Sequence, residues 1–372
     1  MLGVGRVSDP PLPDFAKALR ERGSRTWTDG ARMNALRTAV QRLRTVWMPG
    51  YSVAVAIAAM LILGFLPFVK MGLVVNGFVL GAIIATGAIG LTLIYGNLNF
   101  ANIAHGDYMA MGAYVAFAIM TGLLPLVGIE GQGFGPFSFG YPLFIALPVA
   151  AAVVAIGAIV LDIGIYRRLR NRGVNAVVIA MASLGLAIAL RGLIQIIWTS
   201  EKHQFPREFR QVYHLPMDVR IPPDSIFIGG LAVVLVIGVY VLLTRTKIGK
   251  AMRATADNPD LARVSGIPTE RVIWATWAIG GGLAAIAGVL LAVFQAQLLP
   301  SMGWEFLIPL FAAVILGGIG NPYGALVGAL VIGVSMEVST QWITPSYKHA
   351  VAFIIMIVLL LARPRGLLGG ST

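Results

Sequence analysis

The sequence predicts an all-α integral membrane protein, a polytopic bundle of eight to ten transmembrane helices. Of the 372 residues, 58% are hydrophobic and 12% are charged, and the mean hydropathy is +0.83. A water-soluble domain of this composition would lack the polar side chains to cover its surface. The apolar residues come in runs of roughly 20, the length of helix that crosses about 30 Å of hydrocarbon. The alternating pattern of a membrane β-barrel is missing.

Ten apolar runs are predicted to build the bundle, and the number of crossings depends on whether the short run at 306–319 spans the membrane. The runs cover residues 51–69, 72–95, 108–127, 142–165, 175–199, 225–243, 272–294, 306–319, 323–341 and 349–362. They divide the chain into a basic N-terminal extension (1–49), a transmembrane domain (50–365) and a C-terminal tail (366–372).

The basic residues predict the orientation of the bundle. Residues 1–49 carry nine Lys or Arg against four acidic residues, 167–172 carry four arginines, and 244–271 carry six basic residues. The positive-inside rule places all three segments, and so the N-terminus, in the cytoplasm. Residues 200–224 carry four basic and four acidic residues and are expected on the outer side.

The N-terminal extension has an amphipathic pattern. Its apolar side chains recur at three- and four-residue steps between arginines, which predicts a helix on the anionic inner leaflet. A solvated basic tail is the alternative. The apolar positions are Met33, Leu36, Val40, Leu43 and Trp47.

Several kinds of site are excluded by composition. The chain has no cysteine and four scattered histidines, so neither a cysteine-ligated metal nor any other metal site is predicted. A nucleotide-binding P-loop has a glycine separated by four residues from Gly-Lys-Ser/Thr. The chain's Gly249–Lys250 pair has Thr244 in place of that glycine and Ala251 in place of the hydroxyl. We therefore expect no cofactor or nucleotide bound by this chain.

The stretch NLNFANIAHGD gathers polar side chains between two predicted spans. An unpaired polar group in hydrocarbon costs several kcal/mol, so these groups need water, one another or backbone freed by a helix break. Gly96 and Gly106 would permit such a break, and a broken helix can line a solute pathway. Wet caps at the membrane surface are the alternative. The candidate pathway residues are Asn97, Asn99, Asn102, His105 and Asp107.

The same stretch carries a family resemblance. The run GLTLIYGNLNFANIAHGDYMAMGAY (90–114) resembles the signature of permease subunits of bacterial branched-chain amino acid ABC importers, with Ile103 where Phe is frequent. The blocks AMRATADNPDLARVSGI (251–267) and AAVILGGIGNPYGALVGALVIG (312–333) are similar to later parts of that family in the same order. The resemblance covers about residues 72–365 and implies a multi-pass protein of the bacterial cytoplasmic (inner) membrane.

The polar segment 244–271 predicts a short helix from its own chemistry. Good capping and first-turn residues open it, a cation lies in its last turn and a glycine can close it in the left-handed conformation. These residues are Asn258, Pro259, Asp260, Arg263 and Gly266. A second cap, Thr269 followed by Glu270, is expected to begin the next span, and an ordinary solvated loop is the alternative for the whole segment.

The resemblance gives this short helix a role. Permeases of ABC importers present a cytoplasmic coupling helix with a Glu-Ala-Ala, three residues, Gly pattern to the ATPase, and Asp260, Leu261, Ala262 and Gly266 stand at those positions. Asp replaces Glu and Leu replaces the first Ala. The ATPase-coupling residues implied are Asn258, Asp260, Ala262, Arg263 and Gly266.

Other residues have structural interpretations. Gly320, Gly324 and Gly328 recur at four-residue spacing and predict close helix packing on one face. Arg191 lies inside a predicted span and is expected to snorkel or to pair within the bundle, and Asp162 is expected to pair with Arg167. Residues 200–224 form the outer loop, and the aromatic residues in it and just before it are expected to dock a binding protein. They are Trp198, Phe205, Phe209 and Tyr213.

The resemblance implies a non-enzymatic permease that imports branched-chain or similar amino acids by alternating access. Its partners would be a second permease subunit, two ATP-binding cassette subunits carrying ATP and Mg²⁺, an extracytoplasmic solute-binding protein and membrane lipid, with no nucleic acid. A urea or short-amide ABC permease is the nearest alternative. An ion-coupled secondary transporter would need buried acidic residues in mid-span, and the predicted spans offer almost none.

Overall fold

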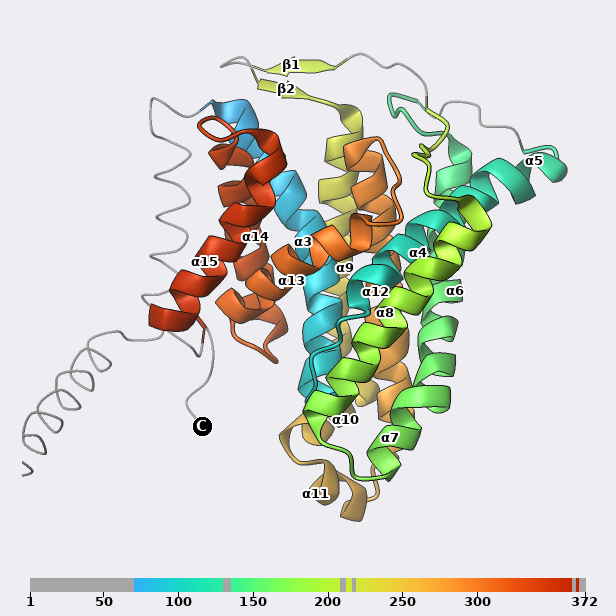
Figure 1. Ribbon diagram of the computed structural model, residues 1–372, viewed down its shortest axis with the longest axis vertical. Coiled ribbons are helices and arrows are strands. Elements are labelled where there is room, and N and C mark those ends of the chain that lie inside the picture. The colour runs from blue at the N-terminus through green and yellow to red at the C-terminus, as the bar shows by residue number, and fades with distance from the viewer. Residues whose placement is uncertain (1–69, 130–134, 208–211, 216–218, 363–365, 368–372) are drawn as a thin grey trace, which may run out of the picture. The chain divides into compact units, whose positions relative to one another are not determined.

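The computed structural model describes residues 70–129, 135–207, 212–215, 219–362 and 366–367. In this part of the chain, seven helices are long and apolar enough to cross a membrane, and two shorter apolar helices accompany them. They pack side by side in one bundle (Figure 1). The predicted all-α membrane bundle is confirmed. The predicted first span, 51–69, and the amphipathic pattern at 33–47 lie outside the described residues.

In the described residues the elements are nine helices of the bundle, the two short helices α10 and α11 between α9 and α12, and short additions at helix ends. They are α3 (Met71–Leu98), α4 (His105–Ala118) continued by η1 (Ile119–Leu123) and α5 (Leu124–Leu126), α6 (Tyr141–Leu161) continued by η2 (Asp162–Tyr166) and α7 (Arg167–Asn171), α8 (Ala176–Trp198), α9 (Pro223–Arg245), α10 (Lys247–Asp257), α11 (Pro259–Val264), α12 (Thr269–Gln295), α13 (Met302–Gly317), α14 (Pro322–Ser339), η4 (Pro345–Tyr347) and α15 (Lys348–Ala362). An antiparallel hairpin, β1 (Tyr213–Leu215) and β2 (Val219–Ile221), precedes α9.

The arginine-rich segment after α6 is largely helical. Here α6 continues through the π-helical turn η2 into α7, so most of the arginines extend the helix. The wider π turn changes which residue lies over Asp162. Arg170 pairs with Asp162 at 2.6 Å, and the predicted partner, Arg167, instead pairs with Glu270 of α12 at 3.3 Å.

Helices α3 and α12 form the centre of the bundle. In the most apolar 18-residue stretch of each helix, 89% of the residues of α3 and 78% of those of α12 are buried, against 28% for α6 and for α8. A helix that is apolar on every face belongs in the interior, and α3 has this composition. The two run antiparallel, since Gly90 lies against Gly280 while Gly87 lies against Ala287.

Glycines allow the closest helix contacts. Gly81 of α3 lies against the backbone of Leu330 in α14. Gly324 and Gly328 of α14 lie against the backbone of α13 at Gly317 and Ala313. The prediction that Gly320 shares a helical face with Gly324 and Gly328 is wrong. Gly320 lies in the turn before α14 with a φ of +85°, so the three glycines do not share one helical face.

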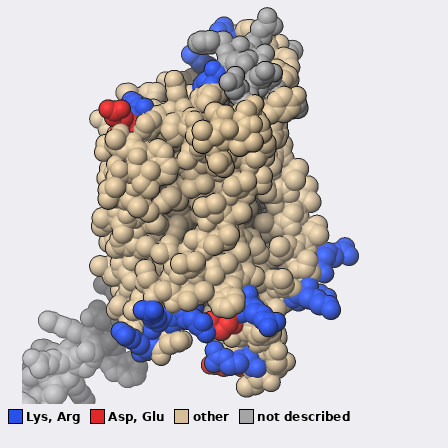
Figure 2. Space-filling view, turned by 90° about the vertical axis from the view of Figure 1, so that its right-hand side faces the viewer, with Lys and Arg blue, Asp and Glu red and all other residues tan. Residues whose placement is uncertain are grey.

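Charge separates the two ends of the bundle. Helices α7, α10 and α11 lie at one end, here called the basic end, and the β hairpin lies at the other, here called the hairpin end (Figure 1). Figure 2 shows the larger group of Lys and Arg at the basic end, a smaller group of charged residues at the hairpin end, and an uncharged belt between them on the face in view. This distribution is that of a protein held in a bilayer.

Candidate functional site

Two helices begin inside the bundle instead of at its ends. The chain leaves α3 at Asn99, climbs through residues 99–104 and starts α4 at His105, whose Nε2 lies 2.9 Å from the carbonyl oxygen of Gly87. Gly87 precedes the last residue of α3 by eleven positions, or about 16 Å of helix. The predicted helix break is therefore present. It occurs at Asn99, which has a φ of +55°, and not at Gly96 or Gly106.

A second break faces the first. The chain leaves α12 at Ala296, which has a φ of +56°, and starts α13 after residues 296–301. The first turns of α4 and α13 then touch, because Gly106 and Gly303 lie backbone to backbone, with no room for a Cβ on either. Since α3 and α12 are antiparallel, the two broken units form an inverted pair, the arrangement that membrane transporters use around a solute site.

Asn102 and His105 are buried within this chain. The tyrosine hydroxyl of Tyr166 donates to the Asn102 side-chain oxygen at 3.4 Å, and the Ile103 amide donates to the Ser183 hydroxyl at 2.9 Å. An aromatic cluster surrounds this part of the linker. Its rings are Phe100, Tyr108, Tyr166 and Trp277, with Tyr166 stacked on Trp277 at 5.1 Å.

Asp107 pairs with an arginine from another helix. Its carboxylate is buried and accepts hydrogen bonds of 3.2–3.4 Å from Nε and Nη2 of Arg191 in α8. The guanidinium also lies 4.9 Å from the ring centroid of Trp304, in the first turn of α13. The expectation that Arg191 pairs within the bundle is confirmed. Trp304 was missed because it lies just before the predicted run 306–319, and nothing in the sequence links it to Arg191.

The five candidate pathway residues therefore lie in four different environments. Asn97 donates to the Leu93 carbonyl of its own helix at 3.1 Å, and Asn99 is exposed beside it. Asn102 fills the aromatic cluster, His105 joins α4 to α3, and Asp107 holds Arg191. Contact of any of them with solute stays a prediction.

The short helix at the basic end has the local structure that the sequence predicts. The Asn258 side chain accepts from the amides of Asp260 and Leu261 at 3.1 and 2.9 Å, Pro259 opens α11, and Gly266 closes it with a φ of +82°. The predicted Thr269 cap is wrong. Pro268 precedes α12 without a side-chain cap, and Thr269 is already the first helical residue.

Coupling residues of α11 differ in exposure. Asp260 and Arg263 expose 90% and 68% of their side chains, whereas Ala262 is buried. Two apolar neighbours are also open to solvent, Leu261 at 62% and Val264 at 81%. The helix therefore presents a mixed apolar and charged surface.

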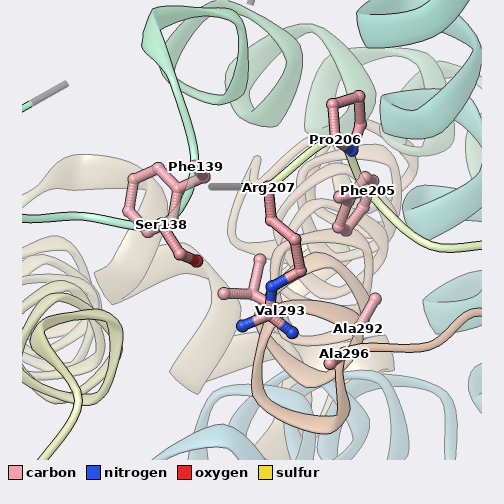
Figure 3. A pocket seen from close by; sticks show the side chains of 8 residues that line it. All are labelled: Ser138, Phe139, Phe205, Pro206, Arg207, Ala292, Val293 and Ala296. Atoms are coloured by element: carbon pink, nitrogen blue, oxygen red, sulfur yellow. The ribbon is translucent and has the colours of Figure 1, made fainter. Parts of the chain in front are cut away.

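An open hollow lies at the hairpin end, over the last turn of α12. Arg207 reaches across it from the outer loop (Figure 3), and its Nη2 lies 3.7 Å from the carboxylate of Asp224. Asp224 also accepts from the amide of Ser138 at 2.8 Å and from its hydroxyl. The lining residues are Ser138, Phe139, Phe205, Pro206, Arg207, Ala292, Val293 and Ala296.

The outer loop is fastened to the second break. His203 and Leu298 exchange backbone hydrogen bonds of 3.1 and 2.7 Å. Two of the aromatic residues expected to dock a partner face inward instead, because Phe205 is buried and Trp198 packs on Tyr114 with ring centroids 5.3 Å apart. Tyr213 is half exposed, and Phe209 lies outside the described residues.

The chain matches the family described as "Branched-chain amino acid transport system / permease component" over residues 73–360. It is 30% identical over 302 residues to the high-affinity branched-chain amino acid transport system permease protein LivH of Salmonella typhimurium, covering 79% of this chain and 94% of that one. It is 31% identical over 301 residues, with the same coverage, to BraD of Pseudomonas aeruginosa, a permease protein of the same description.

A more distant relative carries a different name. The autoinducer 2 import system permease protein LsrD of Yersinia enterocolitica is 28% identical over 238 residues, covering 59% of this chain and 69% of that one. No solved structure matches the chain. The family match covers most of the membrane bundle, including both breaks and α11. This chain therefore belongs to the branched-chain amino acid transport permease family and is a permease subunit of an ABC importer in the inner membrane.

Proposed function

We propose that this permease carries branched-chain amino acids, or amino acids of similar size, into the cytoplasm, driven by ATP hydrolysis on separate subunits. The names of the relatives LivH and BraD support the solute class. The basic end of the bundle is assigned to the cytoplasm, because Lys and Arg collect there. The chain itself supplies no P-loop, so the motor belongs to partner chains.

The surface of α11 is the observation that carries this proposal. Leu261 and Val264 expose 62% and 81% of their surface on a helix fixed by the Asn258 cap and by Gly266. Exposed apolar side chains on a rigid element mark a protein interface. The exposed charges of Asp260 and Arg263 flank them and would set the register of a partner. An ATP-binding cassette subunit is the partner that fits the basic end of an importer.

The fold connects this surface to the breaks in the bundle. α11 is joined to α12 by four residues, 265–268, and α12 runs for 27 residues, about 40 Å. Its far end opens into residues 296–301, the linker that the outer loop holds and that leads into α13. A displacement of α11 by the ATPase pair would therefore reach the second break. Alternating access between two permease chains is the expected result.

Pairing of the buried carboxylates supports an ATP-driven mechanism over an ion-coupled one. In the described part of the chain the buried acids are Asp107, Asp162, Asp224 and Glu337. Their partners are Arg191, Arg170, Ser138 with Arg207, and Lys348. A carboxylate that already holds a cationic side chain is a poor site for Na⁺.

The test is transport by the complete importer in proteoliposomes. With radiolabelled leucine on its binding protein and ATP inside the vesicles, we expect uptake that persists when ionophores dissipate the proton and sodium gradients. Gly266→Val, which disfavours the positive φ that closes α11, should reduce both ATPase assembly and uptake. The proposal would be refuted if uptake stopped when the gradients were dissipated and continued when ATP was left out.

A further inference from the structure

Arg191 lies at the place where α8 passes the starts of α4 and α13. It is a charged residue in the interior of a membrane helix, and 23% of its side chain is exposed. Asp107 holds one edge of the guanidinium, at 3.2–3.4 Å, and Trp304 covers one of its faces at 4.9 Å. The group is thus fixed in position by residues of two other helices.

The pairing leaves part of the guanidinium unused. Its hydrogen bonds to Asp107 come from Nε and Nη2, and Nη1 has no partner in the described residues. A guanidinium carries five N–H donors and stays charged at any physiological pH. Donors of a charged group facing lipid tails would be costly. The open edge of Arg191 therefore faces water or another polar group.

The same side of α8 carries a second polar group at membrane depth. Gln195, one helical turn further along, is exposed, and no described residue hydrogen-bonds its amide. Two polar side chains on the open side of a spanning helix indicate a wet face. Apolar surface adjoins them, because Ile188 and Trp304 expose 63% and 42% of their area. The face combines a cation, an amide and apolar surface, the elements needed to recognise an amino acid with an aliphatic side chain.

We propose that Arg191 meets the carboxylate of the amino acid solute in the translocation pathway, with Asp107 and Trp304 holding it in place. This rests on the proposed function. The charge of Asp107 offsets that of Arg191, while the first turns of α4 and α13 add the positive ends of two helices. The site is therefore positive overall and favours an anionic group. Sharing with Asp107 keeps the contact weak, and a pathway residue must release its solute.

The experiment compares variants of the complete importer in proteoliposomes, with leucine uptake measured per ATP hydrolysed. Arg191→Gln removes the cation but leaves Asp107 buried without a partner. The double variant Asp107→Asn with Arg191→Gln removes both charges and keeps similar shapes. Asp107→Asn alone keeps the cation. Arg170→Gln is the matched control, because it breaks another pair between a buried aspartate and a partly exposed arginine, at the basic end.

We expect the double variant to assemble and to hydrolyse ATP when the loaded binding protein is added, with uptake per ATP lowered by about tenfold or more, as expected for loss of a charged hydrogen-bond pair. Asp107→Asn keeps the cation but loses the contact that positions it, so it should lower uptake less than the double variant does. Arg170→Gln should keep uptake per assembled complex within about threefold of wild type. Uptake by the double variant equal to wild type would show a purely structural ion pair and overturn the inference. Failure of wild-type uptake would instead count against the proposed function.

Discussion

At the scale of single residues, the contact between Gly106 and Gly303 has the sharpest consequence. A Cβ on Gly106 would overlap the carbonyl oxygen of Gly303, and backbone cannot rotate away as a side chain can. Gly106→Ala should therefore lower the stability of the purified protein by about 1–3 kcal/mol. Thermal unfolding in detergent measures this.

Gly157 of α6 provides the control for that substitution. It also lies inside a membrane helix, but nothing within 4 Å would meet its Cβ. Gly157→Ala should be neutral or slightly stabilising, because alanine is the better helix former. Equal melting temperatures for the two variants would contradict the close approach of α4 and α13.

Burial determines how much each ion pair at the basic end contributes to the stability of the protein. Asp162 is fully buried under Arg170, whereas Arg167 and Glu270 expose 38% and 40% of their side chains. Arg170→Gln leaves a buried charge without its partner and should cost about 3–5 kcal/mol. Arg167→Gln breaks an exposed pair and should cost less than about 1 kcal/mol. Chemical denaturation of both variants checks the order, and a reversed order would contradict the burial of Asp162.

The residues that make the two helix breaks were not the ones that the sequence predicted. Glycines were expected to make the first break because they tolerate left-handed backbone. Asn99 makes it instead, and asparagine is one of the few other residues that adopt this conformation. Ala296 makes the second break, and nothing in its side chain signals a positive φ. The backbone hydrogen bonds of the outer loop to Leu298, two residues further on, are long-range contacts that the sequence does not reveal.

At the scale of elements, the sequence predicted the features that depend on neighbouring residues. It did not predict contacts between residues far apart in the chain. The cap, first turn and end of α11 involve neighbours in sequence, so Asn258, Pro259 and Gly266 predicted it. The bounds of the spans likewise follow from runs of apolar residues. The meeting of α4 with α13 joins residues about 200 positions apart, and only the shortness of the run at 306–319 indicated that α13 begins inside the bundle.

The cap of α11 gives a prediction for this element. Asn258→Ala removes the acceptor of two amide hydrogen bonds and should destabilise the helix start by about 1 kcal/mol. Faster hydrogen exchange at Asp260 and Leu261 is expected, together with weaker stimulation of the ATPase. Asn175→Ala, which removes the side-chain cap at the start of α8, is the control. It should leave exchange in α11 unchanged, and equal effects of both variants would contradict a local role for Asn258.

At the scale of the whole molecule, two antiparallel broken units surround one point. Each has a long central helix, a six-residue linker and a second helix that begins at mid-bundle. The outer loop is fastened to one linker, and the aromatic cluster packs around the other. Movement of either linker would therefore shift the contact between Gly106 and Gly303.

The orientation of the whole molecule is open to a direct test because the natural chain has no cysteine. A single cysteine can be placed at Val264, which is 81% exposed at the basic end, or at Tyr213, which is 50% exposed at the hairpin end. With the basic end in the cytoplasm, a membrane-impermeant maleimide should label Tyr213→Cys in intact spheroplasts and Val264→Cys only in inside-out vesicles. Leucine uptake by each variant shows that it is folded. Labelling of Val264→Cys in sealed spheroplasts would invert the orientation and remove α11 from the reach of any cytoplasmic ATPase.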